Sequence, residues 1–327
     1  MKRRGDAVVP GRRRRSGLVL KAVLSLSLLA WAFSSADVGG AAAVVAELGP
    51  VAWLLCILLI IAQLPQLALR WQQVLRASGQ ALGFGDAFRF TYVGYFFNQL
   101  LPTTVGGDFM RGYLAWKRGL PFDAAVASVL LDRSTGMAVL ALLSLLLLSG
   151  PAAAPVFEIE LSWIILGLAV LAVAGLVALA FLGAPFRKGA GEGVFVTVLR
   201  AVEKQYRALW KRPAAACAVL LLAASSAATG AAGFFAAVWF LELPIGFLHV
   251  LGFTSLAIIA TIVPVTVAGW GIRENLLVWL MAPYGIPAET ALGISIWFGL
   301  CATLAAVPGA YVWSTSGSRI DQEDGAR

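Results

Sequence analysis

Charged residues are scarce in this chain of 327 residues, of which they make up 13%. An average soluble domain carries about a quarter. Histidine and cysteine are scarcer still, with one histidine and three cysteines. Cys56, Cys217 and Cys301 lie far apart in apolar segments and form no CxxC pair. This distribution argues against a disulfide framework and against a His/Cys metal centre.

Long apolar runs take the place of the missing charge, and 60% of the residues are hydrophobic. A run of about 20 apolar residues is long enough to cross the hydrocarbon core of a bilayer. These runs are continuous and do not alternate with period two, which disfavours a transmembrane barrel. We therefore predict an all-α polytopic membrane protein. Six spans are expected at residues 17–36, 48–69, 122–149, 162–184, 214–241 and 288–313.

The net charge of +8 is concentrated in a few places. Basic residues crowd the N-terminus (1–16) and the stretch 187–212, whereas 37–47 and the loop around Glu158 contain none. The positive-inside rule then predicts that both termini are cytoplasmic. No nucleic-acid recognition module accompanies the charge, so nucleic acid is not an expected partner. The basic start could precede a cleaved signal peptide, but SSADVGGAAAVV fits a cleavage site loosely, and we favour a retained signal-anchor helix.

Two further apolar stretches contain helix-breaking residues. The first, at 88–119, begins and ends among basic residues, and its apolar part at 88–101 is too short to cross. The second, at 247–285, lies between a span that ends outside and a span that begins outside. We interpret both as re-entrant hairpins that enter from opposite faces. For residues 245–267 the alternative is a full span, which would make Arg273 cytoplasmic.

These two stretches repeat each other. LPTTVGGDFMR and VPVTVAGWGIR align without a gap at an offset of 162 residues. The matched residues are Pro102 and Pro264, Thr104 and Thr266, Val105 and Val267, Gly107 and Gly269, and Arg111 and Arg273. By loop charge the two units, 48–149 and 214–313, run in opposite directions. Inverted repeats with broken helices are typical of transporters, with the substrate at the repeat interface.

Each break offers chemistry for an anion. Pro102 ends one half-helix, and Gly106 and Gly107 permit a reversal of the chain. The next helix is expected to start near Asp108, so its free N–H groups and positive dipole end face the break. We expect Asp108 to cap this helix and Arg111 to bind a phosphate. The alternative is an ordinary glycine-rich loop with snorkelling arginines, which the matched second copy disfavours.

Asp132 and Arg133 lie inside an expected span, where a charge costs at least about 2.5 kcal/mol. Adjacent residues point about 100° apart on a helix and pair poorly with each other. Asp132 shares a face with Ser128 and Gly136, so we expect it to face the bundle. The two charges are hypothesised to gate or to relay a proton. The alternative is a structural ion pair between Asp132 and a hairpin charge.

The stretch 197–212, TVLRAVEKQYRALWKR, is amphipathic and basic. We expect it to lie on the inner leaflet against anionic lipid headgroups, with a partner-binding role as the weaker alternative. No Ser/His/Asp set, paired-carboxylate site or P-loop is present. We therefore expect neither an enzyme nor a bound cofactor.

A family resemblance is carried by NQLLPTTVGGDFMRGYLAWKRG, LLDRSTG and VPVTVAGWGIRENLLVWLMAPYGIP. Together these resemble the lysylphosphatidylglycerol synthase transmembrane-domain family, also called flippase-like, from about Val51 to Trp313. The resemblance implies a domain that moves aminoacylated phosphatidylglycerol between leaflets. The best-understood members carry an aminoacyl-transferase domain after it, which is not expected here because the chain stops at Arg327. Stand-alone members are associated with glycolipid, polyprenol-linked or hopanoid pathways. Ala268 and Trp270 depart from the usual small residues of the second motif.

We thus expect one flippase-like domain at 17–313 with a cytoplasmic tail at 314–327, in a bacterial inner membrane. Its expected function is translocation of a phospholipid, glycolipid or polyprenyl-linked lipid. A membrane-embedded enzyme or an accessory scaffold of an envelope pathway is the alternative, and a small-ion or solute transporter is the third. A glycosyltransferase or a lipid-synthesis enzyme is an expected partner. The candidate substrate-binding residues are Asn98, Pro102, Thr104, Gly106, Gly107, Asp108, Arg111, Asp132, Arg133, Thr266, Gly269, Gly271, Arg273 and Glu274.

Overall fold

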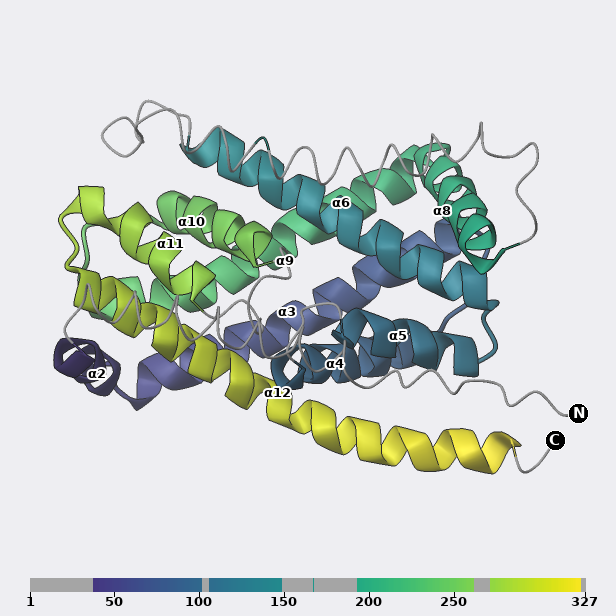
Figure 1. The fold of residues 1–327 in the computed structure, drawn as a ribbon, viewed down its shortest axis with the longest axis horizontal. Coiled ribbons are helices and arrows are strands. Elements are labelled where there is room, and N and C mark those ends of the chain that lie inside the picture. Colours follow the sequence, from purple (N-terminus) through teal and green to yellow (C-terminus); the bar gives the residue numbers. More distant parts are fainter. Residues whose placement is uncertain (1–37, 102–105, 149–166, 168–192, 262–270, 325–327) are drawn as a thin grey trace, which may run out of the picture.

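The computed structural model describes residues 38–101, 106–148, 167, 193–261 and 271–324, and these residues are helical with short connections (Figure 1). The helices are α2 (Val38–Glu47), α3 (Pro50–Ala77), α4 (Phe84–Leu100), α5 (Gly106–Lys117), α6 (Phe122–Leu148), α8 (Val194–Trp210), α9 (Pro213–Phe240), α10 (Phe247–Ala260), α11 (Ile272–Met281), the 3₁₀ turn η3 (Ala282–Tyr284) and α12 (Ala288–Asp324).

Within those ranges, four helices are long and apolar enough to cross a membrane: α3, α6, α9 and residues 288–315 of α12. They confirm the expected spans at 48–69, 122–149, 214–241 and 288–313. Proline begins α3 at Pro50 and α9 at Pro213, where its missing N–H costs nothing. The spans expected at 17–36 and 162–184 lie outside the described residues, apart from Gly167. The chain is therefore a multi-pass helical membrane protein.

The two stretches with helix breakers form pairs of short helices. Helices α4, α5, α10 and α11 contain 17, 12, 14 and 10 residues, fewer than the roughly 20 that a span needs. Helix α4 packs against α5, and α10 packs against α11. The tips at 102–105 and 262–270 lie outside the described residues. A paired arrangement fits two hairpins, and their depth in the bilayer stays a prediction.

The packing of the two units has two features that fit the expected inverted repeat. Helix α3 packs along α9 in the antiparallel direction: Gly233 lies against Cys56 at one end, and Arg212 donates to the Arg76 carbonyl oxygen at the other, 3.1 Å away. The last long helix of each unit packs against helices of the other unit. Helix α6 of the first unit packs against α9 and α10, and α12 of the second packs against α3 and α4. In Figure 1, α3 and α9 run together through the centre of the bundle. A two-fold relation between the units predicts both features.

Equivalent turns in the two units are closed by glycine. Gly119, between α5 and α6, has a φ of 102°, and Gly285, before α12, has a φ of 74°. These are the first residues of GLPFDAA and GIPAETA, the echoed segments of the repeat. A positive φ strains residues with a Cβ, so the repeat retains glycine at both turns.

Residues 37–47 were expected to connect two spans, and the helix α2 that they contain was not predicted. Small residues make the helix possible here, since α2 packs closely on α12. A Cβ on Gly293 of α12 would lie 2.8 Å from the Ala41 carbonyl oxygen and 2.9 Å from the Val44 side chain. The absence of a side chain at Gly293 therefore allows the two backbones to approach.

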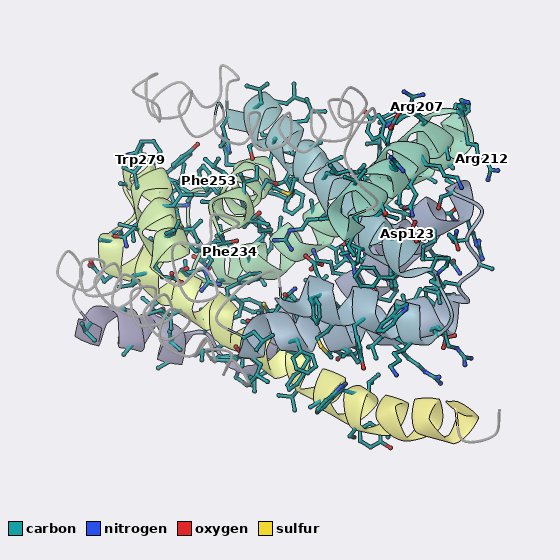
Figure 2. All side chains as sticks on the ribbon, turned by 45° about the vertical axis from the view of Figure 1, so that its right-hand side comes forward. Asp123, Arg207, Arg212, Phe234, Phe253 and Trp279 are labelled. Atoms are coloured by element: carbon teal, nitrogen blue, oxygen red, sulfur yellow. The ribbon has the colours of Figure 1, made fainter. Side chains whose placement is uncertain are left out.

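The amphipathic stretch forms α8, whose apolar face is covered by other helices of the bundle. Leu209 is 1% exposed and packs with Val74 and Leu131 of α3 and α6. The Gln205 side-chain amide donates to the Ala124 carbonyl oxygen over 2.9 Å. Figure 2 shows the basic residue Arg207 on the outside of this corner of the molecule. Helix α8 is thus attached to α6, and its contact with a lipid surface stays a prediction.

Candidate functional site

A cavity of about 380 Å³ lies where the two units meet. The first unit lines it with residues of α3, α4, α5 and α6, and the second with residues of α9, α10, α11 and α12. Each hairpin helix and each long helix of the repeat thus reaches the cavity. The lining is apolar for much of its extent but includes a group of arginines and aspartates, whose contacts are described next.

Asp132 of α6 joins three helices. It is 1% exposed and accepts hydrogen bonds from Arg70 of α3, at 2.7 Å from Nε and 3.2 Å from a terminal nitrogen. Arg111 of α5 donates to the same carboxylate over 2.9 Å. The Arg111 guanidinium also lies over the Trp71 ring, 4.7 Å from its centroid. A buried carboxylate with charged donors from two helices holds those helices in register.

Asp108 of α5 extends this set of charges toward the cavity. One of its carboxylate oxygens accepts from Arg111 over 3.2 Å, and the other accepts from Arg133 of α6. The five residues form an alternating chain in the order Arg70, Asp132, Arg111, Asp108 and Arg133. The side chains of Asp108 and Arg133 are 15% and 25% exposed. This series of ion pairs therefore runs from a buried end at Arg70 to an accessible end at Arg133.

The two helices of the first hairpin, α4 and α5, approach each other closely at Gly94 and Gly107. The Gly107 N–H, at the start of α5, donates to the Asn98 side-chain oxygen of α4 over 2.9 Å. A Cβ on Gly107 would lie 1.9 Å from the Gly94 carbonyl oxygen, which no real structure tolerates. Asn98 therefore supplies a hydrogen bond at this helix start that we had assigned to Asp108. Both Asp108 oxygens accept from arginines, and a capping role for Asp108 stays a prediction.

The second hairpin holds its charges within α11. Glu274 is fully buried and accepts from the Gly271 N–H over 2.6 Å, which satisfies one backbone donor at the helix start. Its other oxygen accepts from Arg273 at 2.5 and 3.0 Å and from the Ser295 hydroxyl of α12 at 3.2 Å. Gly271 has a φ of 92°, which favours glycine there. Arg273, 20% exposed, reaches the cavity.

A family model for the lysylphosphatidylglycerol synthase TM region matches residues 18–309. The chain belongs to this family. No curated protein matches the chain. The family is one of membrane proteins of lipid-related and envelope processes, which agrees with the apolar helices and with the resemblance seen in the motifs.

The structure of this family member brings half of the candidate residues together. Those that line the cavity are Asn98, Gly107, Asp108, Arg111, Asp132, Arg133 and Arg273. Gly106 and Glu274 adjoin these residues in the chain without lining the cavity, and Gly271 is bonded to Glu274. Pro102, Thr104, Thr266 and Gly269 lie outside the described residues. Both repeat arginines, Arg111 and Arg273, thus reach the same space from opposite hairpins.

Several polar residues of the cavity were missed from the sequence. Arg70 was not a candidate because it follows the span expected at 48–69, although it lies within α3 and holds Asp132. Gln63 of α3 also lines the cavity and donates to the Ser226 carbonyl oxygen of α9 over 2.7 Å. An interrupted apolar run was the available signal, because a polar side chain inside a span usually faces the bundle interior.

The cavity has an excess of positive charge. Four arginines line it, Arg70, Arg111, Arg133 and Arg273, against two aspartates, which is a formal surplus of two charges. Counting Glu274, which is bonded to Arg273, leaves a surplus of one. Arginine forks bind phosphate oxygens in pairs, so the site has the chemistry of an anion receptor.

Proposed function

We propose that this protein is a lipid translocase that moves a phosphate-bearing lipid between the two leaflets of a bacterial inner membrane. One observation carries the proposal: the units 48–149 and 214–313, which we expect to be inverted repeats, enclose a shared cavity lined by arginines from both of them. Charges inside a membrane protein cost energy and are kept mainly where they pair or bind a substrate. A cavity at the interface of inverted repeats is the usual place for a transporter substrate.

The size of the cavity suits a headgroup rather than a whole lipid. Its volume of about 380 Å³ lies at the lower end of the range, roughly 300–1,000 Å³, that encloses small-molecule ligands. The acyl or polyprenyl chains would stay in the hydrocarbon while the polar headgroup crosses through protein. Such a path removes the main barrier to exchange, which is the transfer of a charged headgroup through lipid.

In this proposal guanidinium groups, rather than helix N-termini, hold the phosphate. The Gly107 and Gly271 N–H groups are already bonded to Asn98 and Glu274. Arg133 and Arg273 are the more accessible arginines, with side chains 25% and 20% exposed, and they belong to different units. A phosphate bound between the units can pass from one face to the other when the units rock against each other.

The proposed activity is transport without chemical change, with both termini in the cytoplasm. The lipid recovered after transport is therefore expected to have the mass that it had before. A glycosyltransferase or lipid-synthesis enzyme on one leaflet would supply the substrate. The helix α8 region, with Arg200 and Lys204 among its basic residues, is the expected contact for anionic headgroups of the inner leaflet.

Reconstitution tests the proposal. Purified protein in vesicles should accelerate leaflet exchange of a fluorescent phosphatidylglycerol, followed by quenching of the outer leaflet. Arg111→Gln should slow this exchange, whereas Arg89→Gln, at an exposed position of α4, should not. Thermal unfolding of each variant in detergent separates lost transport from lost folding. Failure to accelerate exchange of any anionic phospholipid, glycolipid or polyprenyl phosphate would refute the proposal.

A further inference from the structure

Hydroxyl side chains inside the described helices mostly donate to a carbonyl oxygen of their own helix. Thr254 of α10, for example, donates to the Val250 oxygen over 2.8 Å. Thr261, which lines the cavity at the end of α10, donates to the Ile258 oxygen over 2.7 Å. Such a local bond satisfies a hydroxyl group that is shielded from water.

Thr91 of α4 departs from this pattern. It lines the cavity, it is 6% exposed, and its hydroxyl has no partner among the described residues. The Ala87 carbonyl oxygen, one turn earlier in α4, is therefore not its acceptor. Ser255 is another buried hydroxyl without a described partner, but it lies outside the described lining of the cavity. A buried hydroxyl that faces a cavity and is not bonded to its own helix indicates a contact with a ligand.

Arg111 of α5 brings a second such donor to the lining. Its two terminal nitrogens donate to Asp132 and Asp108 over 2.9 and 3.2 Å, whereas its Nε has no partner among the described residues. The two aspartates and the Trp71 ring hold the guanidinium in one orientation. An arginine Nε can only donate, so this buried atom requires an acceptor.

The two donors belong to helices that pack closely. A Cβ on Gly94, which follows Thr91 by three residues on the same face of α4, would lie 3.5 Å from the Arg111 Cβ. Thr91 and Arg111 are therefore neighbours across the contact of α4 with α5, in the lower part of the bundle in Figure 1. The Arg111 side chain is 7% exposed and that of Arg133 is 25% exposed. Thr91 and Arg111 thus lie at the buried end of the cavity.

We propose that the Thr91 hydroxyl and the Arg111 Nε bind a phosphate oxygen of the lipid headgroup at this buried end. The assignment rests on the proposed translocation and adds Thr91 to the binding residues of the same site. A phosphate oxygen accepts from more than one donor, and hydrogen bonds to a charged acceptor are the strong ones. Because the contact is with the phosphate, it applies to headgroups with and without an amine.

Thr91→Val tests the contact, because valine has nearly the shape of threonine and lacks the hydroxyl. The purified full chain and the variant are melted in detergent with increasing lipid, and the rise in Tm gives the dissociation constant. Phosphatidylglycerol and phosphatidylethanolamine should each bind Thr91→Val at least about tenfold more weakly, since a hydrogen bond to a charged group is lost. Glucosyl diacylglycerol, which has no phosphate, should raise the Tm of both proteins equally.

Two results of this titration would overturn the proposal. One is an unchanged affinity of Thr91→Val for both phospholipids, which is also the result expected if the hydroxyl binds only an internal water. The other is an equal loss of affinity for the phospholipids and for glucosyl diacylglycerol, because a contact with phosphate cannot weaken the binding of a lipid that has none.

Thr254→Val is the matched control. Thr254 is 8% exposed, lies in α10 of the second hairpin outside the described lining of the cavity, and is bonded to its own helix. Its replacement should leave phospholipid affinity unchanged. Thr91→Val removes a hydroxyl without a described partner, so its Tm before lipid is added should equal or exceed that of the wild type. A lower Tm with unchanged affinity would mean a structural hydroxyl and would contradict the proposal.

A soluble phosphate is the other source of such an oxygen. Glycerol phosphate at the same concentrations should raise the Tm less than phosphatidylglycerol does, because it lacks the acyl chains that contact the apolar surface of the protein. A rise in Tm with glycerol phosphate that depends on Thr91, and no rise with phosphatidylglycerol, would assign the cavity to a soluble phosphate and overturn the lipid contact.

Leaflet exchange separates this contact from the translocation on which it rests. If the wild type and Thr91→Val accelerate exchange of fluorescent phosphatidylglycerol equally and bind it equally, the contact fails and translocation stands. If binding depends on Thr91 but the wild type exchanges the lipid no faster than empty vesicles do, translocation fails and the contact stands. Accelerated exchange by the wild type that is slower in Thr91→Val supports both.

Discussion

Replacing Asp132 by asparagine should destabilise the protein severely. The side chain is 1% exposed and is the acceptor for three guanidinium hydrogen bonds. Asparagine keeps the size but removes the negative charge, which leaves Arg70 buried without an acid. Breaking a buried ion pair by removing one partner costs about 3–5 kcal/mol. For a chain of this length, that corresponds to a fall in Tm on the order of 5–10 °C.

The assay is thermal unfolding in detergent, followed by intrinsic tryptophan fluorescence. Asp123→Asn is the matched control, because it makes the same change in the first turn of the same helix outside the cavity lining. Its loss should stay below about 1 kcal/mol, the size of a helix-dipole contact. A second change, Arg70→Gln, should recover part of the loss in the Asp132→Asn protein because it removes the stranded charge.

Two results would refute this account of Asp132. One is a Tm of Asp132→Asn that equals that of the Asp123→Asn control. The other is an additive loss in the double variant with Arg70→Gln, since residues that share a buried ion pair must show a coupling energy. Either result would mean that the carboxylate does not hold α3, α5 and α6 together.

Three other changes test the packing around the site. Gly107→Ala should lower the free energy of unfolding by at least about 1–3 kcal/mol, as overpacking does, because its Cβ meets the Gly94 carbonyl oxygen. Gly112→Ala, whose Cβ would lie 3.6 Å from the nearest atom, should be tolerated in the same melting assay. Asn98→Ala should cost about 0.5–2 kcal/mol and speed amide exchange at the start of α5, and unchanged exchange would contradict its capping role. Leu209→Ala should cost about 2–5 kcal/mol and expose α8 to protease, whereas a comparable effect of the exposed Arg207→Ala would count against this anchor.

The sequence was sufficient to predict the long helices, because each one follows from a continuous apolar run within its own segment. A run of apolar residues such as that of α9 predicts a span without reference to any other segment. The repeat of the two hairpins was visible as well, since the matched residues lie at one constant offset. The helix at 38–47 was not predicted because it packs closely against Gly293, which is far away in the sequence.

The ion pairs could be predicted only in part. The cost of burying Asp132 implied a partner, and Arg111 of the hairpin is one of its two partners. The choice of Arg70 as the other depends on how α3 crosses α6, which no periodicity reveals. Asn98 was a candidate for substrate binding, but its role as the cap of α5 follows from the turn geometry of the hairpin.

The most direct test of the central claim is to block the cavity and measure lipid exchange. Gln99 lines the cavity, whereas Cys217 is the exposed native cysteine and Cys56 and Cys301 are buried. A Gln99→Cys protein labelled with a bulky maleimide should lose accelerated exchange of phosphatidylglycerol in vesicles. The labelled wild type, modified at Cys217, and the unlabelled variant should retain it. Exchange by the labelled Gln99→Cys protein at the wild-type rate would contradict passage of the headgroup through this cavity.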